Sequence, residues 1–176
     1  MNKELKKNLW HAVLVGIGSG ILIGVYALLN ALGFVQQPLY WACFIVLPLV
    51  FMFGGKWSDV VPHIGNVWFG LLCGWCTFQL VNLMVGATGL PLAFGIATCI
   101  MTVVLQGITG GFLATSIGRC PMAFAGMVCC FAANGENLLV AVISLAVGIV
   151  CATLFVQSGA LAAKLAGIKP EETPQA

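Results

Sequence analysis

The middle of this 176-residue chain is almost free of charged side chains, and this feature constrains its fold most strongly. From residue 8 to residue 163 the only charged residues are Lys56, Asp59, Arg119 and Glu136. Charged residues make up 7% of the chain, whereas about 25% is usual in soluble proteins. A soluble domain of this size could not cover its surface with so few charges. The sequence therefore predicts an all-α integral membrane protein and excludes the soluble, disordered and nucleic-acid-binding classes.

Apolar runs separated by turn residues predict six membrane-spanning helices within a single domain, residues 1–176. A helix needs about 20 apolar residues to cross the bilayer core. Each break between two runs carries Gly, Pro or Asn, as turns do. The predicted spans are residues 9–32, 39–54, 67–85, 91–114, 121–134 and 137–160.

The basic residues predict how these spans are oriented. With six full crossings and both termini in the cytoplasm, all seven Lys and Arg residues face the cytoplasm, as the positive-inside rule requires. The second and fifth runs are short, so re-entrant half-helices are the alternative. That arrangement would move Lys56 and Arg119 to the outside, so full crossings are favoured.

The two halves of the sequence follow the same order of elements. Each half has a long Gly-containing run, a short run led by Pro38 or Pro121, a polar turn, and a second long run. Because three spans per half is an odd number, the second half would be inverted relative to the first. The pattern therefore predicts two inverted three-helix repeats with a pathway where they meet. The alternative is that a Gly-rich six-span chain only resembles a repeat.

Neutral polar residues inside the predicted spans are the candidate lining of that pathway. Gln79 and Asn82 are three residues apart, and Thr102 and Gln106 are four apart, so each pair shares a helix face. Amides both donate and accept hydrogen bonds, which suits a small neutral solute. Ion-coupled carriers usually keep charged residues at membrane depth, and the predicted spans have none there. The alternative is that these side chains only bond helices to one another.

Glycines four residues apart let helix backbones approach closely, either within the bundle or between two copies of the chain. Such glycines are Gly16, Gly20 and Gly24 in the first predicted span and Gly70 and Gly74 in the third.

The cysteines and histidines give weaker signals. Cys73 and Cys76 have the CxxC spacing of redox motifs, but no Lys or Arg lies nearby to favour a reactive thiolate. The eight cysteines are therefore interpreted as small apolar residues. His11 and His63 lack the ligand spacing of a metal site. His63 is interpreted as a solvated loop residue, and the alternative is a proton relay with the nearby Asp59. No metal and no cofactor is predicted.

One segment of the second half is similar to a known family. Residues 121–127 (PMAFAGM), 131–137 (FAANGEN) and 143–148 (ISLAVG) resemble a family of small bacterial inner-membrane proteins of unknown function, domain of unknown function 1097. The resemblance covers nearly the whole chain. It implies a bacterial inner-membrane location and a multi-span α-helical fold, and it carries no activity or site residues. The twin Asn-Pro-Ala motif of aquaporins is missing.

These observations predict a passive transporter or channel for a small neutral or weakly polar solute in the bacterial inner membrane. The predicted partners are the lipid bilayer and the solute, with homo-oligomerisation through the glycine faces left open, and no nucleic acid. One alternative is a non-transporting membrane assembly or regulatory subunit. A less favoured alternative is a membrane redox protein that uses Cys73 and Cys76.

Overall fold

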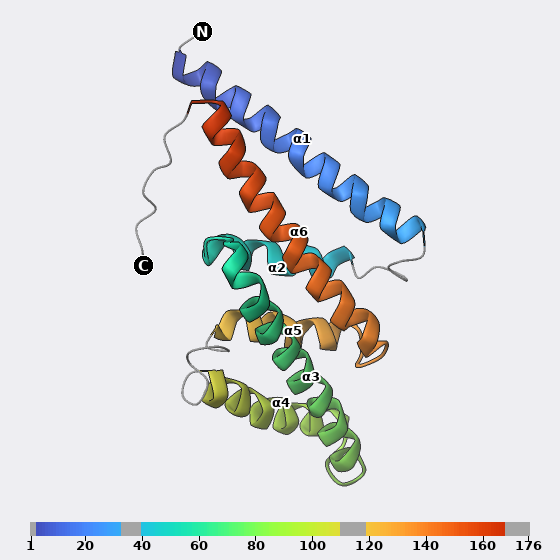
Figure 1. The fold of residues 1–176 in the computed structure, drawn as a ribbon. Helices are drawn as coiled ribbons and strands as arrows, with labels where there is room; N and C mark the ends of the chain where they lie inside the picture. The colour runs from blue at the N-terminus through green and yellow to red at the C-terminus, as the bar shows by residue number, and fades with distance from the viewer. Residues whose placement is uncertain (1–2, 33–39, 110–118, 168–176) are drawn as a thin grey trace.

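A computed structural model describes residues 3–32, 40–109 and 119–167, and in these residues the chain forms helices and turns without strands (Figure 1). Six α-helices follow one another, as the sequence predicts. They are α1 (Lys3–Ala31), α2 (Tyr40–Met52), α3 (Val60–Thr88), α4 (Leu90–Gly107), α5 (Cys120–Ala132) and α6 (Leu138–Leu165), with a short 3-10 helix η1 (Trp57–Asp59) before α3.

Helix α3 begins earlier than the predicted third span, so the expected break over residues 54–65 is too long. Pro62 lies in the first turn of α3. Backbone N–H groups in the first turn have no partner within the helix, so proline, which lacks this group, is tolerated there. The polar residues that follow Pro62 therefore continue the helix. The expected break over residues 33–38 and the end of the fourth span, residues 110–114, lie outside the described residues.

Within the described residues, three helical segments are long and apolar enough to cross a membrane: Trp57–Thr88, Leu90–Gly107 and Leu138–Leu165. Shorter apolar segments are Leu9–Val25 and Cys120–Ala132. Helices α2 and α5 have 13 residues each. At 1.5 Å per residue each is about 20 Å long, which is less than the roughly 30 Å of a hydrocarbon core.

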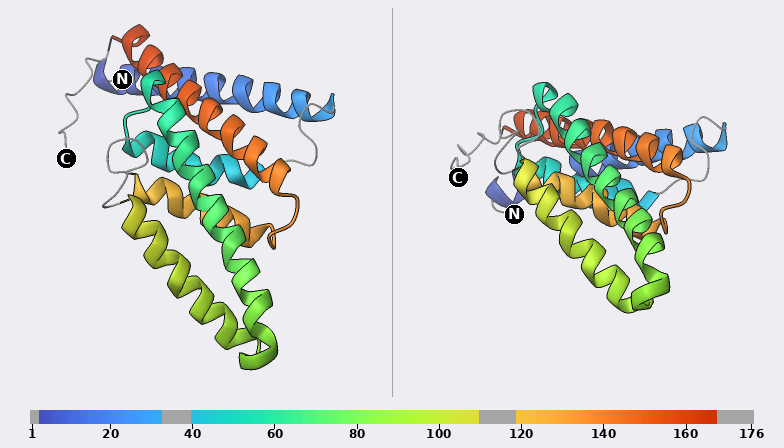
Figure 2. Two further views of the ribbon diagram at one scale, coloured as in Figure 1. Left: turned by 60° about the horizontal axis from the view of Figure 1, so that its bottom comes forward. Right: turned by 90° about the horizontal axis from the view of Figure 1, so that it is seen from below.

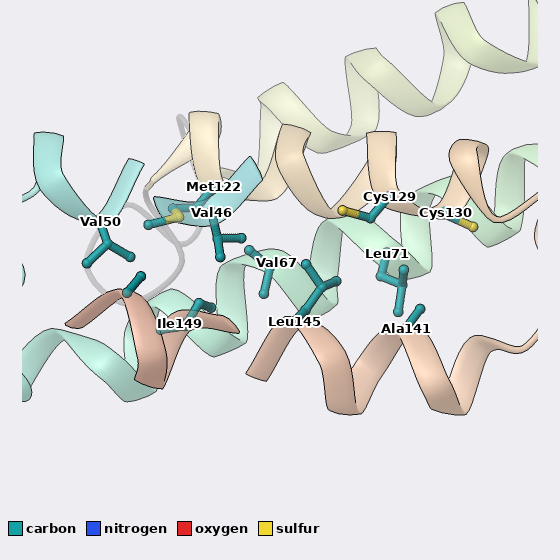
Figure 3. Close-up of a cluster of buried hydrophobic side chains, with 11 residues drawn as sticks. Val46, Val50, Val67, Leu71, Met122, Cys129, Cys130, Ala141, Leu145 and Ile149 are labelled. Atoms are coloured by element: carbon teal, nitrogen blue, oxygen red, sulfur yellow. The ribbon is translucent and has the colours of Figure 1, made fainter. Parts of the chain in front are cut away.

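Two helix pairs form the centre of the bundle, α3 with α5 and α2 with α6 (Figures 1 and 2). Helix α4 lies along α3, and α1 lies along α6. The main apolar core joins α2, α3, α5 and α6 (Figure 3). Its buried residues are Val46, Val50, Val67, Leu71, Met122, Cys129, Cys130, Ala141, Leu145, Ile149 and Ala152.

Helices α3 and α5 touch backbone to backbone because glycine occupies the contact on both sides. A Cβ atom at Gly70 would overlap the carbonyl oxygen of Ala123, and one at Gly126 would overlap the carbonyl oxygen of Val67. A Cβ atom at Gly74 would lie 2.5 Å from the Cβ of Cys130. In contrast, a Cβ atom at Gly16, Gly20 or Gly24 of α1 would meet no described residue within 4 Å beyond the helix itself.

The short helices α2 and α5 end in the same way. Three backbone hydrogen bonds follow each helix. Every donor and acceptor after α2 has a counterpart after α5, and the difference in residue number is the same for all of them. The donor–acceptor pairs are Phe53–Leu49, Gly54–Phe51 and Gly55–Val50 after α2, and Ala133–Cys129, Asn134–Phe131 and Gly135–Cys130 after α5. Both turns then continue through two residues with positive φ, Gly54 and Gly55 in one and Asn134 and Gly135 in the other.

Each of these turns packs against a long helix from the other half of the chain. A Cβ atom at Gly55 would lie 2.6 Å from Cγ1 of Val156 on α6. A Cβ atom at Gly135 would lie 2.9 Å from Cδ2 of Phe78 on α3. Glycine is required at both positions, because a side chain would need both a left-handed backbone and space that a neighbour already fills.

Candidate functional site

A group of four polar or charged side chains and one aromatic ring joins the beginning of α3 to the beginning of α5. This Arg119 cluster consists of Phe53, Asp59, His63, Asn66 and Arg119. His63 and Asn66 are 0% exposed, while the side chains of Asp59 and Arg119 are 19% and 28% exposed. Asp59, His63 and Asn66 are spaced four and three residues apart, which brings them to one side of the η1–α3 segment.

Asn66 fixes the start of α5 to α3. The backbone N–H of Arg119 donates to Oδ1 of Asn66 over 3.1 Å. Nδ2 of Asn66 donates to the carbonyl oxygen of Pro62 over 2.7 Å. Both ends of this buried amide therefore have a partner, and the helix end that carries Arg119 is held against the first turns of α3.

The guanidinium of Arg119 meets three side chains. Its Nη1 lies 3.0 Å from Nδ1 and 2.9 Å from Nε2 of His63, and its Nη2 lies 3.4 Å from Oδ1 of Asp59. Its Cζ lies 5.0 Å from the ring centroid of Phe53, within the range of a cation–π contact. A neutral imidazole has one acceptor nitrogen, so only one of the two short distances to His63 is a hydrogen bond.

The Arg119 cluster gathers α2, η1, α3 and α5 at one end of the bundle around one cation and one anion. Its arrangement corrects the interpretation of His63 as a solvated loop residue. His63 lies within α3 and is fully buried, because the helix begins before it and both Arg119 and Phe53 cover its ring. The Arg119 cluster as a whole acts as a clamp between helices, because charge attraction and hydrogen bonds hold the beginnings of α3 and α5 together.

The predicted pathway residues lie on the outward faces of α3 and α4. Gln79, Asn82 and Gln106 are exposed, and Thr102 is half-buried. None of the four side chains forms a hydrogen bond with another described residue. Gln106 lies on the side of α4 away from the buried residues that pack on α3, so the structure does not bring it to Gln79.

Besides the amides of Asn66, Gln79, Asn82 and Gln106, a fifth amide has a defined partner. It is Gln157, which the sequence did not single out. Nε2 of Gln157 on α6 donates to the carbonyl oxygen of Gly55 over 2.7 Å. Gln157 follows Val156, the residue whose side chain touches Gly55. The side chain therefore ties α6 to the turn that follows α2.

Among the described cysteines, Cys73, Cys76, Cys99, Cys120 and Cys130 are free thiols. Cys73 is buried in an apolar cluster with Ala123 and Met127, and Cys76 is half-buried beside it. These surroundings are those of a small apolar side chain. Among the described residues no three His, Cys, Asp or Glu side chains are grouped so that they could hold a metal ion.

The comparison with known families agrees with the resemblance found in the sequence. Residues 12–160 match the family described as "Protein of unknown function (DUF1097)", and the match covers most of the chain. The chain belongs to this family. The DUF1097 match extends from α1 into α6, so it includes the whole Arg119 cluster and all five amides discussed above. No curated protein and no solved structure matches the chain.

Proposed function

We propose that this DUF1097 chain crosses the bacterial inner membrane six times and passes a small neutral polar solute passively. The single observation that carries the proposal is the exposure of three amides on helices long and apolar enough to cross a membrane: Gln79 and Asn82 on α3 and, separately, Gln106 on α4. An amide that faces hydrocarbon without a hydrogen-bond partner is costly. A solute that exchanges its water for these donors and acceptors removes that cost.

The packing of the helices supports two inverted halves. Helix α2 packs on α6 as α5 packs on α3, and α1 lies along α6 as α4 lies along α3. The matched turns strengthen this relation. Gly55 meets Val156, and Gly135 meets Phe78. The separation in sequence between the two glycines is nearly the same as the separation between their two partners. Inverted repeats of this kind carry their pathway where the halves meet. In this chain α3 and α6 cross there, and Gln79 and Asn82 belong to α3.

The distribution of charge supports passive passage. Lys56, Asp59, Arg119 and Glu136 lie outside the α-helices, close to helix ends. The long segments between these ends carry no Asp or Glu that could bind a coupling ion. Movement of the solute would then follow its own gradient.

We expect both termini and the turn around Lys56 to face the cytoplasm, because this topology puts all seven basic residues on one side. Reporter fusions after Ala176, after Lys56 and after Glu136 check the orientation. The first two should give a cytoplasmic signal and the third a periplasmic one. A periplasmic signal after Ala176 or Lys56 would overturn the topology.

Liposome reconstitution tests the transport function. Wild-type protein should accelerate the flux of at least one member of a panel of small neutral solutes, followed by light scattering. Gln79→Leu and Gln106→Leu should each reduce that flux several-fold, because the solute loses a donor and an acceptor, while the folded yield in detergent stays near normal. Lowered stability with unchanged flux per folded molecule would assign the amides to packing.

A second candidate function, a non-transporting membrane subunit, is favoured by the glycines of α1. A Cβ atom at Gly20 or Gly24 would meet nothing within 4 Å, so these positions do not serve packing among the described residues. A helix of another subunit could approach closely there. Wild-type protein that gives no flux for any solute, but that co-purifies with a partner lost on Gly20→Leu, would favour this role.

A further inference from the structure

The Gln157–Gly55 hydrogen bond closes one end of the boundary between the two halves. Gly55 is pressed against Val156, and the next side chain, Gln157, donates to the Gly55 carbonyl over 2.7 Å. The Arg119 cluster lies at the same end, since Phe53 and Asp59 flank this turn in the chain. Helix α6 is therefore held on the α2 turn by a neutral hydrogen bond, close to the charged cluster that joins α3 to α5.

The other half has an equivalent turn glycine, packed side chain and glutamine, but without the hydrogen bond from the glutamine to the glycine carbonyl. Gly135 is pressed against Phe78 as Gly55 is against Val156, and the next residue after Phe78 is again a glutamine, Gln79. The two turns that contain these glycines have equivalent sets of three backbone hydrogen bonds. Gln79 is exposed, however, and neither its amide nor the Gly135 carbonyl forms a hydrogen bond with another described residue.

We propose that Gln79 and the carbonyl of Gly135 form the periplasmic gate, that Gln157 and the carbonyl of Gly55 form the cytoplasmic gate, and that the two hydrogen bonds form in alternation. This inference rests on the proposed function and makes the protein a carrier rather than a continuously open channel. The structure corresponds to the state with the Gly55 gate closed and the Gly135 gate open.

The physical basis is the near-equivalence of the two halves. If each half can adopt the conformation of the other, the two states of the whole chain differ little in free energy, and both are populated. A neutral hydrogen bond suits such a gate because its net contribution is small enough to be broken and re-formed thermally. The amides also fit the solute class, since a solute with donors and acceptors can replace the broken bond.

The test measures opening of the cytoplasmic gate by thiol labelling of the full chain in liposomes. The reporter is Thr153→Cys in a background whose native cysteines are replaced. Thr153 lies one helical turn from Val156, is fully buried, and its hydroxyl has no hydrogen-bond partner among the described residues, so the substitution breaks no bond. A membrane-impermeant maleimide is applied from the side of Lys56.

The two gate variants should change the labelling rate in opposite directions. Gln157→Leu should raise it about 3-fold or more, the factor expected for loss of one neutral hydrogen bond. Gln79→Leu should lower it by a similar factor, because it removes the bond that closes the opposite gate in the cytoplasm-open state. Leu83→Ala, at an apolar side chain of the same helix that is 81% exposed, is the control and should leave the rate unchanged.

The outcomes separate this inference from the proposed function. An unchanged or raised rate in Gln79→Leu would overturn the alternation, because a purely local role of Gln157 predicts no effect from the other half. Opposite changes in the two variants support alternation even if wild-type liposomes give no solute flux, in which case only the transport function fails. Wild-type flux with no labelling effect of Gln79→Leu leaves transport standing and removes the gates. Size-exclusion chromatography of each variant confirms that it is folded.

Discussion

Replacing Gly70 or Gly126 with alanine is expected to destabilise the folded chain by about 1–3 kcal/mol or more, the cost of forcing extra atoms into a close-packed interface. At both positions the new Cβ atom would overlap a backbone carbonyl of the facing helix, that of Ala123 or Val67. Backbone cannot move aside as the end of a long side chain can. Helices α3 and α5 would have to separate, which would loosen the main core. Thermal unfolding in detergent and the yield of monodisperse protein measure the effect.

The matched control is Gly20→Ala, which makes the same chemical change on α1. Outside its own stretch of helix, no described residue has an atom within 4 Å of the new Cβ, so only helix propensity changes. Alanine is favoured over glycine in a helix interior by roughly 0.5–1 kcal/mol, so this variant should be as stable as wild type or slightly more stable. Equal destabilisation by Gly20→Ala and Gly70→Ala would contradict the assignment of tight packing to the α3–α5 interface.

Replacing Asn66 with leucine should cost roughly 1–3 kcal/mol, because one buried backbone N–H group loses its partner and an unpaired buried group costs about that much. This group is the N–H of Arg119. The carbonyl oxygen of Pro62 loses one donor but keeps its place in the backbone hydrogen bonds of α3. The start of α5 would lose its hydrogen bond to α3, and the guanidinium of Arg119 would no longer be held against Asp59. We expect a lower melting temperature and faster proteolysis near residue 119.

Asn82→Leu is the control for this change, since it makes the same substitution on the same helix. Asn82 is exposed and forms no hydrogen bond with another described residue, so its replacement should leave the melting temperature unchanged or raise it. If Asn66→Leu and Asn82→Leu were equally stable, the clamp role of Asn66 would be wrong. The pair therefore separates hydrogen bonding from the general effect of removing an amide.

The sequence predicted the class and order of the fold because these depend on local composition. Runs of apolar residues broken by Gly, Pro and Asn correspond to the six helices of the structure, with ends shifted by a few residues in most cases. The clearest error lies before the third span, where polar residues were assigned to a loop. His63 and Asn66 are tolerated within α3 because other parts of the chain satisfy and cover them, which composition alone cannot reveal.

The sequence identified Gln79 and Asn82 by their spacing, and the structure adds that they are exposed. The spacing of Asp59, His63 and Asn66 also carried a usable signal, since residues three and four apart share a helix face. Nothing in the sequence linked them to Arg119, which lies more than fifty positions away. Gln157 was missed for the same reason, because its partner belongs to the opposite half of the chain.

By itself the sequence determined that the chain is helical and apolar, how many helices it has and where most of them begin and end. These properties follow from hydrophobicity and backbone preference, which act over a few residues. The tertiary structure alone decided which glycines allow helices to touch, which polar side chains are satisfied, and which turn each long helix packs against. Those outcomes depend on contacts between residues far apart in the chain, where the fit of backbone to backbone and of donor to acceptor determines which arrangement is stable.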